Sequence, residues 1–204
     1  MNKDRFGTLA AAVLLIAALC AMAMPASAGS YDRYAAATYA SDNAYKNVPG
    51  TWRFSNSESG GDCTNFVSHC LKHGGWTEVG GYWTYTSSYS WYYNYPYRRG
   101  YSYTWAVADR FCDFLTYSGR AYPRSLAHKP WKNYFQLGDV IQMDGVNGES
   151  ANDEWDHTMI ITGICSDDLL VSYHSPNTRD ESLKAIMARN PNARFMGWCI
   201  RDRY

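Results

Sequence analysis

One cysteine of this chain stands where a thiol would be activated as a nucleophile. Cys63 directly follows Asp62, after a glycine pair, in the segment 60–68 that reads GGDCTNFVS. Glycines favour a tight turn, Asp is a common helix N-cap, and the residues that follow predict a helix. In the first turn of a helix, free N–H groups and the helix dipole favour a thiolate and lower the pKa of the thiol. We therefore expect Cys63 to be a nucleophile; the alternative is a small buried helix residue.

A cysteine nucleophile needs a base, and the base needs a group that orients it. His157 opens a short apolar run and is expected at the first residue of a strand, while His174 ends the next predicted strand. If the two strands form a hairpin, both histidines lie at one edge of the sheet. A helix N-terminus packed there would place Cys63, His157 as base and His174 as orienter in a row. Asn177 is the alternative orienter, and His157 could instead be a histidine satisfied at a strand end.

Aromatic residues crowd the stretch from 80 to 103, which has no clear period of 2 or 3.6 residues. We expect a loop with short extended pieces, whose rings either stack on sugar or peptide or pack as ordinary core. Trp83 and Trp91 in this stretch, and Trp155 shortly before His157, are the expected substrate-binding residues.

Two further histidines have the spacing of a metal-binding pair. His69 and His73 lie four residues apart on the predicted nucleophile helix, with Cys70 nearby. No carboxylate completes a ligand set, so packing or surface roles are favoured over a metal site.

The remaining pattern predicts helices followed by strands, which is an α+β arrangement. Alanine-rich sequence predicts a helix over 31–46, a Pro- and Gly-containing loop follows over 47–61, and the nucleophile helix covers 62–72. Helical spacing recurs over 104–117, and a short helix is expected over 181–189. Strands are expected at 139–143, 158–162, 169–173 and 194–200, separated by turns at 145–148 and 166–168. We expect these strands to form an antiparallel sheet.

The first 28 residues have the pattern of a secretory signal peptide: a basic start, an apolar run from Leu9 to Met24, and a small-residue cleavage site ending at Ala28. Residues 29–204 are then expected to be one exported domain, a monomer without stable membrane insertion. Charges balance in the full sequence, 19 basic against 19 acidic residues. This composition does not favour nucleic-acid binding, which rests on a basic surface.

Cysteine parity also bears on Cys63. Removal of the signal segment takes away Cys20 and leaves five cysteines: Cys63, Cys70, Cys112, Cys165 and Cys199. An odd count in a secreted protein points to intermolecular pairing or to one free reactive thiol. The other four could form two disulfides, or all five could be reduced.

These motifs together resemble a known family of domains. The matching stretches are 31–33 with its alanine-rich helix, 61–68 (GDCTNFVS), 138–141 (GDVI), 156–158 (DHT) and 172–174 (SYH). They resemble the family described as "putative amidase domain", found in secreted bacterial proteins and related to papain-like, NlpC-type and CHAP-type cysteine hydrolases. The resemblance covers nearly all of the predicted mature domain.

The resemblance implies a papain-like fold and a site in which Cys63 is the nucleophile and His157 the base. His174 best matches the third position, where related families carry His, Asn, Glu or Gln. It implies hydrolysis of an amide through a thioester, without a metal or organic cofactor, and with cell-wall peptidoglycan as the expected substrate. Two alternatives stay open: an inactive module that binds glycan or peptide, and an acyltransferase that uses the same thioester.

Overall fold

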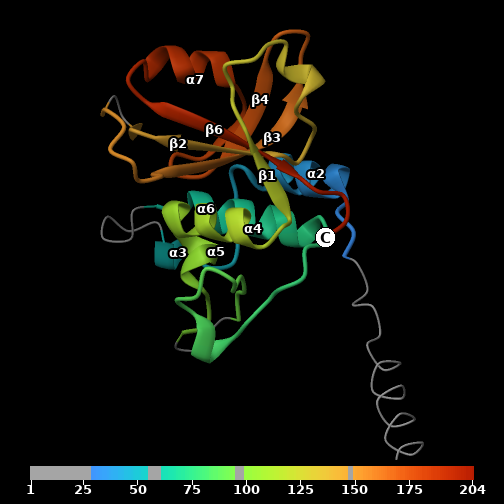
Figure 1. Ribbon diagram of the computed structural model, residues 1–204, viewed down its shortest axis with the longest axis vertical. Coiled ribbons are helices and arrows are strands. Elements are labelled where there is room, and N and C mark those ends of the chain that lie inside the picture. The colour runs from blue at the N-terminus through green and yellow to red at the C-terminus, as the bar shows by residue number, and fades with distance from the viewer. Residues whose placement is uncertain (1–28, 55–60, 95–98, 147–148) are drawn as a thin grey trace, which may run out of the picture.

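The computed structural model describes residues 29–54, 61–94, 99–146 and 149–204. The predicted signal peptide, 1–28, lies outside the described residues. The described chain has an α+β fold, as expected, in which helices pack on an antiparallel sheet (Figure 1). Its α-helices are α2 (Arg33–Asn43), α3 (Thr51–Phe54), α4 (Cys63–His73), α5 (Tyr103–Ala106), α6 (Ala108–Tyr117) and α7 (Leu183–Arg189).

The strands form one antiparallel sheet with the strand order β1-β6-β2-β3-β4-β5. They are β1 (Ala121–Arg124), β2 (Val140–Asp144), β3 (His157–Ile164), β4 (Leu169–Tyr173), β5 (Thr178–Ser182) and β6 (Arg194–Ile200). Val140 pairs with Ile160, and Ile160 pairs with Ser172. The predicted hairpin of β3 and β4 is therefore confirmed.

The sheet separates two hydrophobic layers. Helices α2, α4, α5 and α6 cover one face, and α7 lies against the other (Figure 1). Side chains alternate along β3, so Ile160 joins Phe66 in the layer on the α4 side, while Met159 joins Ile186 in the layer on the α7 side. This alternation decides which face each residue at the start of β3 can reach.

The N-terminal helix is fastened to the start of β2 by side chains of the motif at 31–33. Tyr31 donates from its hydroxyl to the carbonyl oxygen of Gly138 at 2.7 Å. Arg33 pairs through Nη1 with Asp139 Oδ1 at 2.7 Å, and through Nε with Asp202 at 2.6 Å. These motif residues thus join parts of the fold that are more than a hundred residues apart in the sequence.

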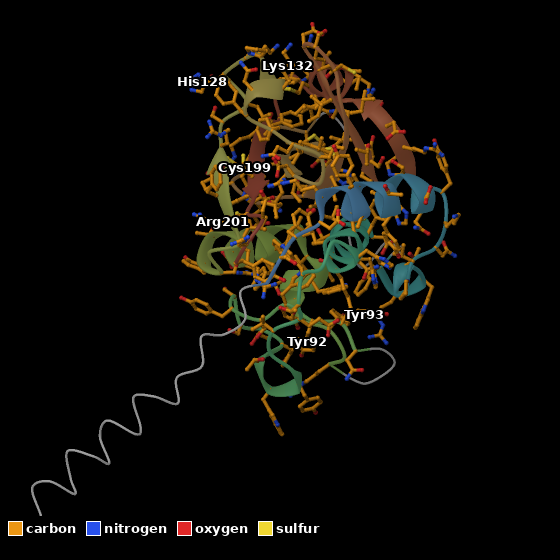
Figure 2. The ribbon with its side chains drawn as sticks, turned by 90° about the vertical axis from the view of Figure 1, so that its right-hand side faces the viewer. Tyr92, Tyr93, His128, Lys132, Cys199 and Arg201 are labelled. Atoms are coloured by element: carbon orange, nitrogen blue, oxygen red, sulfur yellow. The ribbon has the colours of Figure 1, made fainter. Side chains whose placement is uncertain are left out.

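The aromatic stretch forms a loop on the side of the helices that faces away from the sheet, where Figure 2 shows Tyr92 and Tyr93. Trp91 of this stretch and Trp105 of the adjoining α5 bond to α4: Trp91 Nε1 donates to Ser68 Oγ at 3.1 Å, and Trp105 Nε1 donates to Asn65 Oδ1 at 2.8 Å. The loop assignment is confirmed, apart from the short 3₁₀ helix Tyr82–Thr84. Residues 95–98 lie outside the described part.

Three elements escaped the sequence analysis. The four-residue α3 falls in a predicted loop, and β1 contains Pro123, which an edge strand tolerates because one side of its backbone is unpaired. The opposite edge strand, β5, reads TRDES and carries no apolar alternation. The predicted helix over 104–117 is divided between α5 and α6, because the backbone of Val107 is extended.

All five cysteines from Cys63 to Cys199 are free thiols in the structure, which matches the fully reduced alternative. Cys199 lies on β6 (Figure 2), where its sulfur contacts the carbonyl oxygen of Tyr134 at 3.4 Å. Among the helices of the described residues, none is long and apolar enough to cross a membrane.

Candidate active site

The predicted nucleophile opens helix α4. Cys63 is the first residue of the helix and is 5% exposed. Its Sγ lies 3.7 Å from Thr64 Oγ1 and 3.9 Å from the carbonyl oxygen of Asp156, the residue directly before His157. The next residue of α4 is tied to the same strand, because the hydroxyls of Thr64 and Thr158 are 2.9 Å apart. The start of α4 is thus held against the start of β3.

The pKa of the Cys63 thiol differs from the expectation. Burial raises the pKa, and this outweighs hydrogen bonds from the backbone of Thr158 and from the hydroxyl and backbone of Thr64, which favour the thiolate. The nearby charge of Asp62 also raises the pKa. The predicted lowering by the helix N-terminus is therefore wrong for the resting protein, and Cys63 is a thiol at neutral pH.

Asp62 is placed as an N-cap but its side chain does not cap the helix. Its Oδ1 instead accepts from Asn65 Nδ2 at 2.8 Å, and its Oδ2 accepts from Thr51 Oγ1 and from a ring nitrogen of His174, both at 2.7 Å. The carboxyl group is 1% exposed, so these three donors replace the water it loses. We call Asp62, Thr51, Asn65 and His174 the buried polar cluster. Because the carboxyl group is turned into this cluster, it does not occupy the backbone N–H groups around Cys63.

His174 belongs wholly to the buried polar cluster. The residue is fully buried, and its ring stacks on Phe66 of α4 with a centroid separation of 4.0 Å. Nδ1 lies 2.7 Å from Asp62 Oδ2, and Nε2 lies 3.2 Å from the carbonyl oxygen of Asn43. Both ring nitrogens of His174 are therefore engaged, and neither is left for a bond to His157.

The residue after His174, Ser175, also binds the backbone directly before Cys63. Ser175 Oγ accepts a hydrogen bond from the backbone N–H of Asp62 at 2.8 Å. Gly61 makes this approach possible, since its φ is +120° and an added Cβ would lie 3.0 Å from the Cβ of Ser175. His174 and Ser175 thus both hold Asp62, the residue directly before Cys63.

His157 has surroundings of the opposite kind. It begins β3, is 7% exposed, and its ring meets the ring of Tyr173 edge to face, with centroids 4.9 Å apart. No hydrogen bond joins this imidazole to another side chain within the described residues. Burial lowers the pKa of His157 to about 4, so the ring is neutral at pH 7. A neutral imidazole can accept a proton, as a general base must.

The predicted row of Cys63, His157 and His174 does not form. His157 packs with Tyr173 on the α7 side of the sheet, whereas His174 stacks on Phe66 on the α4 side. The cause is the two-residue period of strands: Thr158 faces α4, where its hydroxyl meets that of Thr64, so adjacent His157 points to the other face. A direct orienting bond from His174 to His157 is therefore wrong. The other predicted orienter, Asn177, is exposed in the turn after β4.

A pocket of about 430 Å³ lies beside His157, between the sheet and α7. Met143, Met159, Tyr173 and Ile186 contribute its apolar wall. Asp156, His157, Ser175 and Arg189 contribute polar groups. Cys63 does not line this pocket, but its sulfur contacts the backbone oxygen of Asp156, which does. The size is typical of a small-molecule or peptide side-chain site.

The three predicted substrate-binding tryptophans lie in different places. Trp91 is completely buried in the core, so the prediction that it binds substrate is wrong. Trp83 is 86% exposed, on the loop below the helices, and does not line the pocket beside His157. Trp155 is half-buried next to that pocket and lies under the guanidinium of Arg194, 4.7 Å from the ring centroid. Trp83 and Trp155 stay predictions.

The histidine pair on α4 is used for packing. His69 Nε2 lies 2.8 Å from the carbonyl oxygen of Pro49, and burial lowers the pKa of His69 to about 4. His73 stacks on Tyr39, with ring centroids 3.8 Å apart. Within the described residues, no group of three or more His, Cys, Asp or Glu side chains is arranged to hold a metal ion.

With this geometry in view, comparison with known proteins decides the family. Residues 30–198 match the model of the family described as "Putative amidase domain". The chain belongs to this family. The match spans both the α4 segment with Cys63 and the β3–β4 hairpin with His157, so the site lies within the family domain.

One curated relative resembles much of the chain. The uncharacterized protein YjcM of Bacillus subtilis (strain 168) is 27% identical over 173 residues, which cover 83% of this chain and 37% of that protein. The chain thus corresponds to less than half the length of this relative. No solved structure matched the chain.

Sequence reasoning missed the partners of Asp62. Thr51, Asn65 and Ser175 are ordinary polar residues in the sequence, and each bonds to Asp62 in the fold. Asn65 was visible within the motif at 61–68, at the i+3 position from Asp62, which is a spacing that brings helical side chains together. The contacts from Thr51 and Ser175 depend on tertiary structure and have no local signal.

Proposed function

We propose that this protein is a cysteine-dependent amidohydrolase in which Cys63 and His157 carry the reaction. Membership in the amidase-domain family supports amide hydrolysis as the reaction class. The observation that carries the residue assignment is the position of Cys63 Sγ at the first turn of α4, 3.9 Å from the backbone that leads into a buried, neutral and uncommitted His157.

The reaction follows from the protonation states of these two groups. His157 takes the proton of the Cys63 thiol as the sulfur attacks the amide carbonyl carbon and forms a C–S bond. The C–N bond then breaks, and the imidazolium gives the proton to the departing amine. A water molecule next gives a proton to His157 and attacks the thioester, and the carboxylic product leaves as Cys63 regains its proton. Both groups begin neutral, so the proton transfer accompanies attack.

The uncapped start of α4 suits the developing negative charge. The backbone N–H of Cys63 is the donor that we assign to the oxyanion, with the positive end of the helix dipole behind it. Asp62 would compete for such donors if its carboxyl group capped the helix. It makes no side-chain cap bond, because the buried polar cluster takes both of its oxygens.

His174 acts as a positioning residue in this proposal. It touches neither the pocket nor His157, but its bond to Asp62 fixes the residue directly before Cys63. This role replaces the expected one, in which His174 orients the base. Packing against the Tyr173 ring, which is nearly perpendicular to the imidazole, limits rotation of His157.

We further propose that the protein is exported as a monomer and acts on peptidoglycan, through a papain-like arrangement related to the NlpC and CHAP types. The signal pattern over 1–28 and the order of motifs support this. Peptidoglycan offers two kinds of amide: the bond between muramic acid and its first amino acid, and the peptide bonds of the stem or cross-bridge.

The test compares residues 29–204 with the Cys63→Ala variant on purified peptidoglycan, with mass spectrometry of the soluble products. We expect the parent protein to release fragments with new amino termini and no new reducing ends, and the variant to release none. A Cys165→Ala variant is the matched control, because Cys165 is an exposed thiol between β3 and β4, at the other end of the hairpin from His157. Release by Cys63→Ala at the parent rate would contradict the proposal. Products coupled to an added amine would indicate acyl transfer instead of hydrolysis.

A further inference from the structure

A chain of buried polar side chains runs from the sheet to the sulfur of Cys63. Trp198 of β6 donates from Nε1 to Gln142 Oε1 at 2.9 Å. Gln142 of β2 donates from Nε2 to Thr158 Oγ1 at 3.5 Å, and the hydroxyls of Thr158 and Thr64 are 2.9 Å apart. Thr64 Oγ1 in turn lies 3.7 Å from Cys63 Sγ. The four residues that lead to the sulfur are at most 3% exposed, so bulk water does not compete for these bonds.

The direction of this chain is set at the end far from the sulfur. An indole nitrogen can only donate, so Trp198 fixes the oxygen of the Gln142 amide on its own side. The amide nitrogen then faces the other way, where it also donates to the carbonyl oxygen of Ala108 at 2.7 Å. Thr158 therefore accepts from Gln142, and its single hydroxyl proton is directed to Thr64. The hydroxyl proton of Thr64 is left to point at the sulfur.

The sulfur is placed to accept this proton. In the thiol form, Cys63 donates toward the carbonyl oxygen of Asp156 at 3.9 Å, which leaves the lone pairs of sulfur for Thr64. The Thr64 hydroxyl and the backbone of Thr64 and Thr158 all favour the thiolate, in opposition to burial. A hydrogen bond to an ionised group is about twice as strong as one between neutral groups, so the Thr64 bond strengthens as His157 takes the thiol proton.

We propose that Thr64 stabilises the Cys63 thiolate, and that Thr158 holds the Thr64 hydroxyl in the donating direction. Thr64 contacts the reacting sulfur, whereas Thr158 is a positioning residue that acts through Thr64. The consequence for catalysis rests on the proposed function. The effect on the thiol does not, because it is measured without a substrate.

Four variants separate the hydroxyl groups from the shapes of the side chains. Thr64→Val keeps the branched shape and removes the donor, whereas Thr64→Ser keeps the hydroxyl. Thr158→Val removes the bond that directs Thr64. Thr104→Val is the matched control, because Thr104 is also buried and its hydroxyl bonds to Ser102 at 2.8 Å instead of to the chain that ends at Cys63.

The experiment follows alkylation of the protein by iodoacetamide over a series of pH values, with the rate at each cysteine read by peptide mapping. We expect Thr64→Val to raise the pKa of the Cys63 thiol by about one unit, which lowers the thiolate fraction about tenfold. Alkylation at neutral pH should then slow roughly three- to tenfold, since a more basic thiolate is also more nucleophilic. The exposed Cys165 reacts in the same molecules and should keep its rate in every variant.

The other variants test whether Thr158 acts through Thr64. Thr158→Val should slow alkylation of Cys63 by less than Thr64→Val does, and Thr64→Ser should stay near the parent rate. The double variant Thr64→Val/Thr158→Val should be no slower than Thr64→Val, because residues that act through one another are not additive. Additive slowing would overturn the role of Thr158, and equal slowing in Thr64→Ser and Thr64→Val would show that shape matters instead of the hydroxyl.

The outcomes separate this inference from the proposed function. An unchanged rate at Cys63 in Thr64→Val, or equal slowing in Thr104→Val, would overturn the role of Thr64. So would a Cys63 that does not react in the parent protein while Cys165 does. The expected slowing in a protein that cleaves no amide would support the inference and remove the proposed function. For a cleaved amide, Thr64→Val should lower kcat severalfold with KM near the parent value, and an unchanged kcat would overturn the consequence for catalysis.

Discussion

His157 and His174 are both buried at the same end of neighbouring strands, yet their polar surroundings are opposite. Each ring nitrogen of His174 has an acceptor, Asp62 on one side and the backbone of Asn43 on the other. Within the described residues the His157 ring makes no hydrogen bond to another side chain; it meets the Tyr173 ring edge to face, lines a pocket, and has a pKa that burial lowers to about 4. A buried histidine with all its bonds made stabilises structure; one without them is free to exchange a proton.

The largest effect on activity should come from substitution of His157. We expect His157→Gln to lower kcat/KM for amide cleavage by roughly 10²–10⁴-fold, the usual contribution of a general base. Its unfolding free energy should not fall, because the His157 ring makes no hydrogen bond to another side chain within the described residues, and the variant removes a buried group that becomes charged in acid. Steady-state kinetics and urea unfolding measure the two effects. Retained activity would place the base elsewhere.

Substitution of His174 should mainly lower stability and leave most of the activity. His174→Phe keeps a ring against Phe66 but removes the bonds to Asp62 and Asn43. Leaving these buried acceptors without a donor should cost roughly 2–4 kcal/mol of unfolding free energy. Activity per folded molecule should stay within about tenfold of the parent, since a positioning residue does not transfer the proton. A loss as large as that of His157→Gln, without loss of stability, would make His174 catalytic.

The stability of the folded protein should decrease in acid, because two buried histidines have lower pKa values in the folded than in the unfolded state. The folded-state pKa values of His157 and His69 are about 4, below the value of about 6.5 for an unfolded chain. Between these values the unfolded state binds more protons, so stability is lost as pH falls from about 6.5 to about 4. Each histidine contributes roughly 3 kcal/mol over this window.

Urea unfolding at several pH values measures this slope, and His157→Gln should reduce it. A slope unchanged by that variant would mean that His157 is not buried in its neutral form. The acid limb of kcat/KM should likewise lie near pH 4, where protonation removes the base, and an acid limb near 6.5 would contradict the pKa of His157.

The smallest effect concerns one donor of the buried polar cluster. Thr51→Val removes a hydroxyl that donates to Asp62 and accepts from the backbone N–H of Val48. Asp62 keeps its bonds to Asn65 and His174, so we expect a loss of roughly 1–2 kcal/mol and near-parent activity. Thermal unfolding of Thr51→Val and His174→Phe compares how much each donor to Asp62 contributes to stability. A larger loss in Thr51→Val would reverse that ranking.

The fold was largely predictable because its main elements have strong local signals. The glycine pair before Cys63, the apolar run after His157 and the turn at 166–168 located α4 and the β3–β4 hairpin. The edge strands were missed because β5 is polar and β1 contains a proline. Neither sequence carries the alternation that reveals a half-buried strand.

The candidate site was predictable as a set of residues but not as a geometry. Cys63 and His157 were both located at the starts of their elements, where the structure has them. The side-chain face of His174 depends on strand register, since a shift of one residue reverses every face. The fate of Asp62 depends on Thr51 and His174, which only the tertiary fold brings to it. The pKa of Cys63 depends on burial, which the local motif does not contain.

The most direct test of the account is to trap the thioester. The protein is mixed with its cleaved substrate, quenched in acid within seconds, and analysed by intact mass and peptide mapping. We predict a mass increase equal to the acyl half of the substrate, located on Cys63 and absent from Cys63→Ala. An adduct on any of the other four free cysteines, or amide cleavage that proceeds in Cys63→Ala, would contradict the central claim that Cys63 is the nucleophile.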